Sequence, residues 1–149
     1  MKSLIFIAGF IFIAVFGYSK EFFESRMEYW NKSPEAVVAF EKLSKETELI
    51  KMYDNPWYMK YAIKIYDEPC TMVYKFSTND DLDVIDYYIP MKYYEQLKKI
   101  VEKKYEKNKK GQMYTSKYFT IGLMQLSEPN DGIFQFIFIK KLESQSGTN

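Results

Sequence analysis

An uninterrupted apolar run near the N-terminus is the feature that most limits what this chain can form. Residues 4–17 carry no polar side chain, and they follow the positive charge of Lys2. A helix that crosses a bilayer needs about 20 apolar residues, whereas the apolar part of an export signal needs only about 7–15. We therefore expect residues 1–19 to be a signal peptide, which leaves about 130 residues for one folded unit.

The residues that end this run leave two cleavage positions and one alternative open. Cleavage after Gly17 or after Ser19 would place small residues at the positions that a signal peptidase recognises. A segment that is not cleaved would instead serve as a membrane anchor. The expected location is outside the cytosol, either secreted or periplasmic, with a membrane-anchored form as the alternative.

The chain contains no histidine and one cysteine, and this composition excludes several kinds of chemistry. Ser–His and Cys–His nucleophile pairs cannot form, and the commonest general acid–base group near neutral pH is missing. A zinc site also lacks its usual ligands. We therefore expect a protein that is not an enzyme and that uses neither metal nor cofactor, with Cys70 buried as a small apolar residue.

The balance of charges argues against nucleic acid as a partner. Without Lys2, the 21 basic residues of the chain become 20, which equals the 20 acidic residues. Arg26 is the single arginine, although the guanidinium fork is the group best suited to phosphate and guanine edges. The expected partner is another protein or a small apolar ligand. Contact with a membrane is expected only if the N-terminal segment is retained.

Periodic patterns predict two well-defined helices after a short one over residues 20–30. Ser33 and Pro34 suit the start of a helix, and apolar residues then recur at three- and four-residue steps up to Ile50. This helix is expected to end near Met52. A second helix is predicted over residues 91–110, with lysines in its last turns and Gly111 directly after it.

Alternating apolar and polar residues predict the strands. The period of two is clearest over residues 57–65, and further strands are expected over 71–76, 82–89, 114–126 and 133–140. Hairpins beside a long helix indicate an α+β fold, an antiparallel sheet of about five strands with two or three helices packed on one face. We expect this domain to span residues 20–141 and a flexible polar tail to cover residues 142–149.

The segment from Asn79 to Asp86 is the densest acidic cluster of the chain. Oxygen ligands at alternate positions suit calcium, but a calcium loop also needs Gly at its sixth position and Glu at its twelfth. Val84 and Pro90 occupy these positions. The segment is therefore predicted to be a solvated turn.

Aromatic residues are the best candidates for a binding surface, since the chain has 14 Tyr and 12 Phe. Three phenylalanines alternate along the strand at residues 133–140, and isoleucines fill the other face. Such a strand is either covered on both faces or open on one, where aromatic side chains supply most of the binding energy. The candidate surface consists of Tyr87, Tyr88, Tyr93, Phe134, Phe136 and Phe138.

Three functions are compatible with these observations. The first is a small exported protein, not a catalyst, that binds a partner through its aromatic-rich sheet. The second is an exported carrier of a small apolar ligand, of lipocalin type; the absence of glycine between Tyr18 and Lys110 counts against it, because barrels use glycine at bends. The third is a membrane-tethered accessory subunit that retains residues 4–18.

Overall fold

The computed structural model describes residues 23, 25–44, 46–54, 57–111, 113–126 and 132–141. The expected signal peptide and polar tail lie outside these residues. None of the helices in the described ranges is long and apolar enough to cross a membrane. In chain order the elements are η1 (Met27–Tyr29), α2 (Pro34–Ser44), β1 (Thr47–Asp54), β2 (Trp57–Ile65), β3 (Glu68–Phe76), β4 (Leu82–Pro90), η2 (Met91–Tyr93), α3 (Tyr94–Lys104), β5 (Glu106–Lys107), β6 (Tyr114–Thr115), β7 (Phe119–Gln125) and β8 (Ile133–Lys140).

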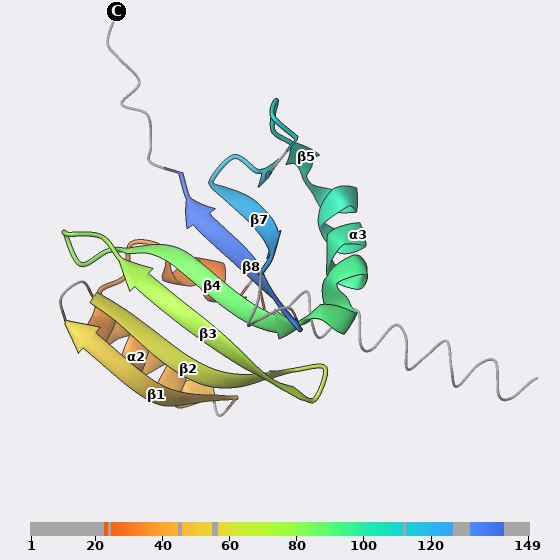
Figure 1. Cartoon of the computed structure of the whole chain (residues 1–149). Helices are drawn as coiled ribbons and strands as arrows, with labels where there is room; N and C mark the ends of the chain where they lie inside the picture. The colour runs from red at the N-terminus through yellow and green to blue at the C-terminus, as the bar shows by residue number, and fades with distance from the viewer. Residues whose placement is uncertain are drawn as a thin grey trace, which may run out of the picture.

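The eight strands form one antiparallel sheet in the order β1-β2-β3-β4-β8-β7-β6-β5 (Figure 1). The first four strands follow one another as hairpins, and α3 then carries the chain to the far part of the sheet. The last four strands return inward until β8 pairs with β4. The α+β class and the antiparallel sheet are confirmed, but the expectation of about five strands is too low.

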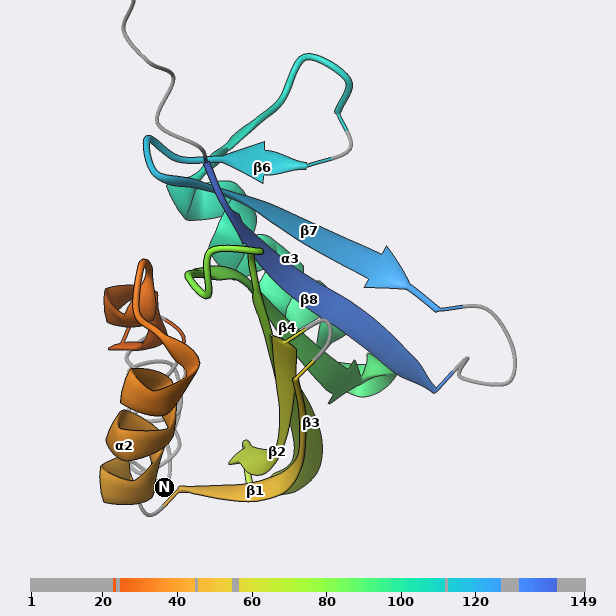
Figure 2. The ribbon, with the colours of Figure 1, turned by 90° about the vertical axis from the view of Figure 1, so that its left-hand side faces the viewer.

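Both helices contribute to one core on the same face of the sheet, which we term the inner face. Val37 of α2 and Leu97 of α3 belong to a single buried cluster with Met59 of β2 and Phe134 of β8. Figure 1 shows α2 behind β1 and β2 and α3 beside β7 and β8, and Figure 2 shows the two helices separated along the sheet. Each helix therefore covers a different half of the inner face.

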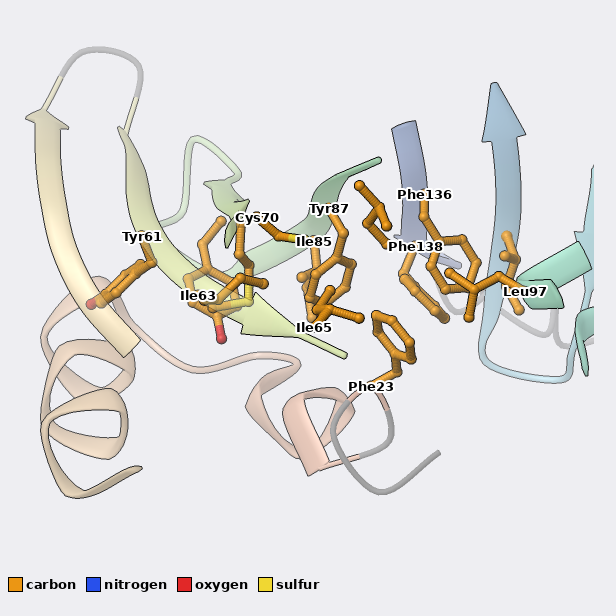
Figure 3. Close-up of a cluster of buried hydrophobic side chains, with 14 of the residues drawn as sticks. Phe23, Tyr61, Ile63, Ile65, Cys70, Ile85, Tyr87, Leu97, Phe136 and Phe138 are labelled. Carbon is orange, nitrogen blue, oxygen red and sulfur yellow. The ribbon is translucent and has the colours of Figure 1, made fainter. Parts of the chain in front are cut away.

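Alternate residues of the central strands point into this core. Figure 3 shows Phe23 reaching from the segment before η1 toward Tyr87 and Phe138. The ring centroid of Phe23 lies 4.8 Å from that of Tyr87 and 6.1 Å from that of Phe138. Burial of a side chain of this size contributes about 1.5–3 kcal/mol, so Phe23 holds the start of the described chain on the sheet.

A buried ion pair fixes α2 to the sheet. Arg26 Nε lies 3.2 Å from Glu41 Oε1, and the two side chains are only 4% and 1% exposed. The hydroxyls of Tyr74 and Thr47 donate hydrogen bonds to the same carboxylate at 2.5 and 2.7 Å. A buried charge requires such partners, so this contact defines how α2 is oriented.

The start of α2 follows the prediction, but its end does not. The amide of Ala36 donates to Ser33 Oγ at 3.4 Å, and Pro34 is the first helical residue. The helix ends at Ser44, and the residues predicted to continue it to Met52 form β1 instead. This prediction was wrong because the β-branched and aromatic residues of 47–54 suit a strand, and pairing with β2 satisfies their backbone groups.

The second predicted helix is also shorter than expected. It begins with the turn η2 and ends at Lys104, after which Tyr105 is extended with φ −129° and ψ 145°. The ring of Tyr105 packs on Phe119 at 5.6 Å, which returns the chain to the sheet. Gly111 does not end the helix; it adopts φ 68° in the turn between β5 and β6.

The remaining strand predictions are close to the observed bounds. The strand over residues 57–65 is confirmed, and the following turn uses Tyr66 and Asp67, both with positive φ. The strand predicted over 114–126 is interrupted where the amide of Ser116 donates to the carbonyl of Phe119 at 2.9 Å. Only the first part of the acidic segment forms the predicted exposed turn, in which Asp80 has φ 59°. From Leu82 onward the segment belongs to β4, and Asp86 is buried, so the prediction of a solvated turn up to Asp86 was wrong.

Candidate binding site on the outer face of the sheet

The structure separates the six residues of the predicted binding surface. Four of them lie in the inner-face core and are at most 3% exposed: Tyr87, Phe134, Phe136 and Phe138. They are buried because α3 and the segment around Phe23 cover this part of the sheet. Tyr88 and Tyr93 are half-buried, and Tyr93 packs on Tyr66 with 4.7 Å between ring centroids. Only these two reach the surface, and they do not form one patch with the phenylalanines.

The opposite face, which we term the outer face, carries neither of the two α-helices. Its residues alternate with those of the core along each strand. Lys60, Val73, Asp86 and Ile137 lie opposite one another across β2, β3, β4 and β8. The outer face therefore presents a mixed row of charged and apolar side chains, which differs from the almost wholly apolar inner face.

A groove of about 450 Å³ lies on the outer face. Three tyrosines line it, Tyr53 of β1, Tyr58 of β2 and Tyr88 of β4, together with Lys60 and Thr71. Apolar side chains complete the lining: Val73 of β3, Ile133 of β8 and Leu126, which follows β7. Tyrosine combines a flat apolar ring with a hydroxyl group, so the groove offers stacking surfaces and hydrogen-bonding groups side by side.

Two of these tyrosines form a stacked pair at the end of the first hairpin. Tyr53 and Tyr58 are directly opposite in the register of β1 and β2, and their rings are 4.0 Å apart with an interplanar angle of 21°. Lys51 Nζ lies 4.3 Å from the centre of the Tyr53 ring. A hydrogen bond from Lys51 lowers the pKa of the Tyr53 hydroxyl. The stack thus combines an aromatic platform with a nearby positive charge.

The groove half of the outer face is basic. Strands β1 to β4 place lysines 51, 60, 64 and 75 on this face, against the carboxylates of Glu48 and Asp86. Lys75 pairs with Asp86. In the described part of the chain, the other three lysines form no ion pair. A ligand that carries negative charge would therefore find uncompensated positive charge beside the tyrosines.

Asp86 is fully buried although it lies on the outer face. Its carboxylate forms an ion pair with Lys75 and accepts a hydrogen bond of 2.9 Å from Gln135 Nε2. These contacts join β3, β4 and β8, and they hold Lys75 over the sheet. Burial raises the pKa of the neighbouring Tyr88 hydroxyl, and the charge of Asp86 adds to that effect. Asp86 thus positions other polar groups and is not itself accessible to a ligand.

Within the described ranges, no three His, Cys, Asp or Glu side chains gather closely enough to hold a metal ion. Cys70 is buried in the core, as predicted, and burial raises the pKa of its thiol to about 11. The thiol is therefore protonated at neutral pH, and thiolate is the reactive form of cysteine.

Sequence reasoning found Tyr88 but missed Tyr53, Tyr58 and Lys60. The reason is the incorrect end of the helix predicted from Pro34 to Met52, which placed the chain before Tyr53 in a helical conformation. A signal was present, because Asn55-Pro56 between two tyrosines is typical of a turn that joins paired strands. A hairpin at this place would have predicted the Tyr53–Tyr58 stack.

These features define an α+β protein with an open antiparallel sheet, two helices on the inner face and a tyrosine-lined groove on the outer face. No protein-family model, no curated protein and no solved structure matches the chain. The site is therefore interpreted from its own chemistry.

Proposed function

We propose that this protein is a small exported binding protein that acts without catalysis and takes its ligand in the tyrosine-lined groove. The observation that carries the proposal is the combination of three groove tyrosines with the lysines of β1 and β2 that have no described acidic partner. This proposal keeps the binding role expected from the sequence. It moves the binding surface from the buried phenylalanines to the outer face.

The chemistry of the groove favours an acidic carbohydrate. The C–H faces of a sugar ring stack on aromatic rings, and the Tyr53–Tyr58 pair and Tyr88 supply such rings. Sugar hydroxyls can bond to the tyrosine hydroxyls and to Thr71, while carboxylates on the sugar can pair with Lys60. Because these lysines are exposed, their contribution is expected to fall as the salt concentration rises.

Calorimetric titration with galacturonate oligosaccharides tests this proposal, with uncharged glucose oligosaccharides of equal length as the control ligand. The acidic ligand should bind and the neutral one should bind far more weakly. Lys60→Gln should reduce the affinity roughly tenfold or more, because a hydrogen bond to a charged group contributes about 1.5–3 kcal/mol. Lys117→Gln, an exposed lysine before β7, should leave the affinity unchanged. Equal binding of both ligands, or no effect of Lys60→Gln, would contradict the proposal.

One observation favours the alternative of a carrier for an apolar ligand. An apolar cavity of about 60 Å³ lies between α3 and the segment 23–27, with Leu97, Ile121 and Phe136 among its walls. Sites for small molecules typically measure about 300–1,000 Å³. The sheet is also open, since β1 and β5 form its two edges. The groove on the outer face is therefore the stronger candidate.

Export itself is tested by the mass of the protein that cells accumulate. Cleavage after Gly17 or Ser19 should give a mature chain that starts at Tyr18 or Lys20, found outside the cytosol. A chain that is found in the membrane fraction with its first residues intact would instead support the membrane-tethered alternative.

A further inference from the structure

Strand β1 is an open edge of the sheet. In the described part of the chain it pairs with β2 alone, and it is eight residues long. One side of an edge strand presents unpaired N–H and C=O groups, which are a template for another strand. At Ile50 the register of β1 on β2 shifts, so this residue has no partner on β2.

The same region carries an unusual amount of exposed apolar surface. Five of the eight large apolar side chains that are exposed in the described ranges lie between residues 40 and 52. Leu49, Ile50 and Met52 of β1 are 41%, 53% and 49% exposed. Phe40 and Leu43 of α2 are 41% and 80% exposed. The ring of Phe40 stacks on Tyr29, with 5.2 Å between centroids. We therefore term the three exposed residues of β1 alone the edge patch; such a concentration on one strand is typical of an interaction surface.

The opposite edge of the sheet is protected. Strand β5 has only two residues, Glu106 and Lys107, and both are exposed and charged. Short strands and charged side chains are the usual means by which proteins block pairing at an edge. In the described residues, the edge beyond β7 is covered only in part, because residues 122–125 pair with β8 alone. Strand β1 differs from this edge in its full length and in its exposed apolar side chains.

The charges of β1 are complementary to those of a second β1. Glu48 and Lys51 both point to the outer face, since they lie opposite Ala62 and Lys60 of β2. In an antiparallel pair about a two-fold axis between Leu49 and Ile50, Glu48 of each chain lies opposite Lys51 of the other. The same register places Leu49 opposite Ile50, and an interface of this kind closes on itself.

We infer that the edge patch is the interface of a homodimer in which β1 pairs with β1 of a second copy in this register. The two sheets then form one continuous sheet, and the exposed apolar residues of β1 are covered by their equivalents in the second copy. Opposite charges directly across an antiparallel pair are favourable, and like charges are unfavourable. The inference does not depend on the ligand proposed for the groove.

Sedimentation velocity over a wide concentration range tests the dimer, with the protein in the form that accumulates when the full chain is expressed. The wild type should reach twice the mass of one chain. Glu48→Lys or Lys51→Glu alone should weaken the dimer at least about tenfold by like-charge contact, and the double variant should restore it. Met124→Lys, which changes an exposed apolar residue outside the edge patch, should not alter the dimer.

Two sedimentation results would overturn the inference: a wild type that has the mass of one chain at every concentration, or a dimer that persists unchanged in both single variants. Circular dichroism shows whether each variant is folded. Amide hydrogen exchange on the wild type tests the pairing of β1 without any variant. The amides of β1 should exchange more slowly as the protein concentration rises, and exchange that is independent of concentration overturns the dimer.

Discussion

The two halves of the inner face are held to their helices by different forces. Under α2 the centre is polar, with the Arg26–Glu41 ion pair and the hydroxyl of Tyr74. Under α3 the contact is apolar: Leu97 and Val101 are buried, and the ring of Tyr94 meets Phe134 edge-on at 5.2 Å. The first arrangement depends on matched charges and the second on packed volume.

This difference explains what each helix presents to solvent. The buried residues of α2 are Pro34, Val37 and Glu41, whereas its apolar residues Phe40 and Leu43 are exposed. Glu41 thus occupies a core position of α2, while Leu43 stays exposed and the ring of Phe40 stacks on Tyr29. In α3 the apolar residues are used in the core, and no comparable patch remains.

The largest expected effect is on the polar half. Glu41→Gln should lower the free energy of unfolding by about 3–5 kcal/mol, because buried Arg26 would lose its close counter-charge and keep only the longer contact of 3.9 Å with the more exposed Glu46. Urea denaturation measures this loss. Glu35→Gln on the exposed start of α2 should change stability by less than about 0.5 kcal/mol.

A second variant distinguishes lost charge pairing from lost packing at the same place. The double change Arg26→Met with Glu41→Leu removes both charges and should lose less stability than Glu41→Gln alone. If the double variant were less stable than Glu41→Gln, the interpretation that charge pairing between Arg26 and Glu41 holds α2 on the sheet would be incorrect.

On the apolar half, Leu97→Ala should cost about 2–5 kcal/mol through lost burial and the cavity that remains. The matched control is Lys99→Ala, which changes an exposed residue on the solvent side of α3. The loss should not depend on salt, in contrast to effects on charged groups. A change below about 1 kcal/mol would show that the packing of α3 contributes little to stability.

Alkaline pH should weaken the core through Cys70 on β3. Burial raises the pKa of its thiol to about 11 from an ordinary 9.0. Between these values the thiol ionises in the unfolded chain but stays protonated in the folded chain, so stability falls as pH rises. The thiol contributes at most about 2–3 kcal/mol to this fall.

Urea denaturation at pH about 8 and about 10.5 measures the effect. Buried tyrosines add to the fall above their ordinary pKa, because burial also raises the pKa of Tyr61, to about 12. Comparison with Cys70→Ala isolates the thiol: the variant should lose less stability between the two pH values than the wild type. Equal losses would show that the thiol does not contribute.

The smallest expected effect concerns the outer face behind α3. A Cβ atom on Gly122 would lie 2.8 Å from Ile137 Cγ2, so Gly122→Ala should cost about 1–3 kcal/mol by overpacking. Gly132→Ala is a matched control, because a Cβ there meets no atom within 4 Å. Thermal unfolding of both variants tests this contrast, and equal melting temperatures would contradict it.

Local patterns in the sequence were sufficient for several elements. The alternation over residues 57–65 predicted β2, and Ser33-Pro34 predicted the start of α2. Both signals depend on residues that are neighbours in the chain, where capping and the two-residue period of a strand act directly. The alternating phenylalanines and isoleucines of residues 133–140 likewise predicted β8, a strand that is apolar on both faces.

The parts that the sequence did not predict depend on contacts between distant residues. An apolar stripe of Val37, Phe40 and Leu43 indicated the buried face of α2, yet Glu41 faces inward because Arg26 and Tyr74 meet it there. The groove likewise joins tyrosines from β1, β2 and β4, whose positions depend on strand register.

By itself, the sequence determined strands such as β2, β4 and β8 and where α2 begins, together with the chemistry that a chain without histidine cannot perform. The tertiary structure alone decided that Glu41 is buried, that the phenylalanines lie inside and that Tyr53, Tyr58 and Tyr88 meet outside. The physical reason is that the sequence period shows only which side of a helix or strand is apolar. Which side chains are buried, and which residues they contact, depends on strand pairing and packing between distant parts of the chain.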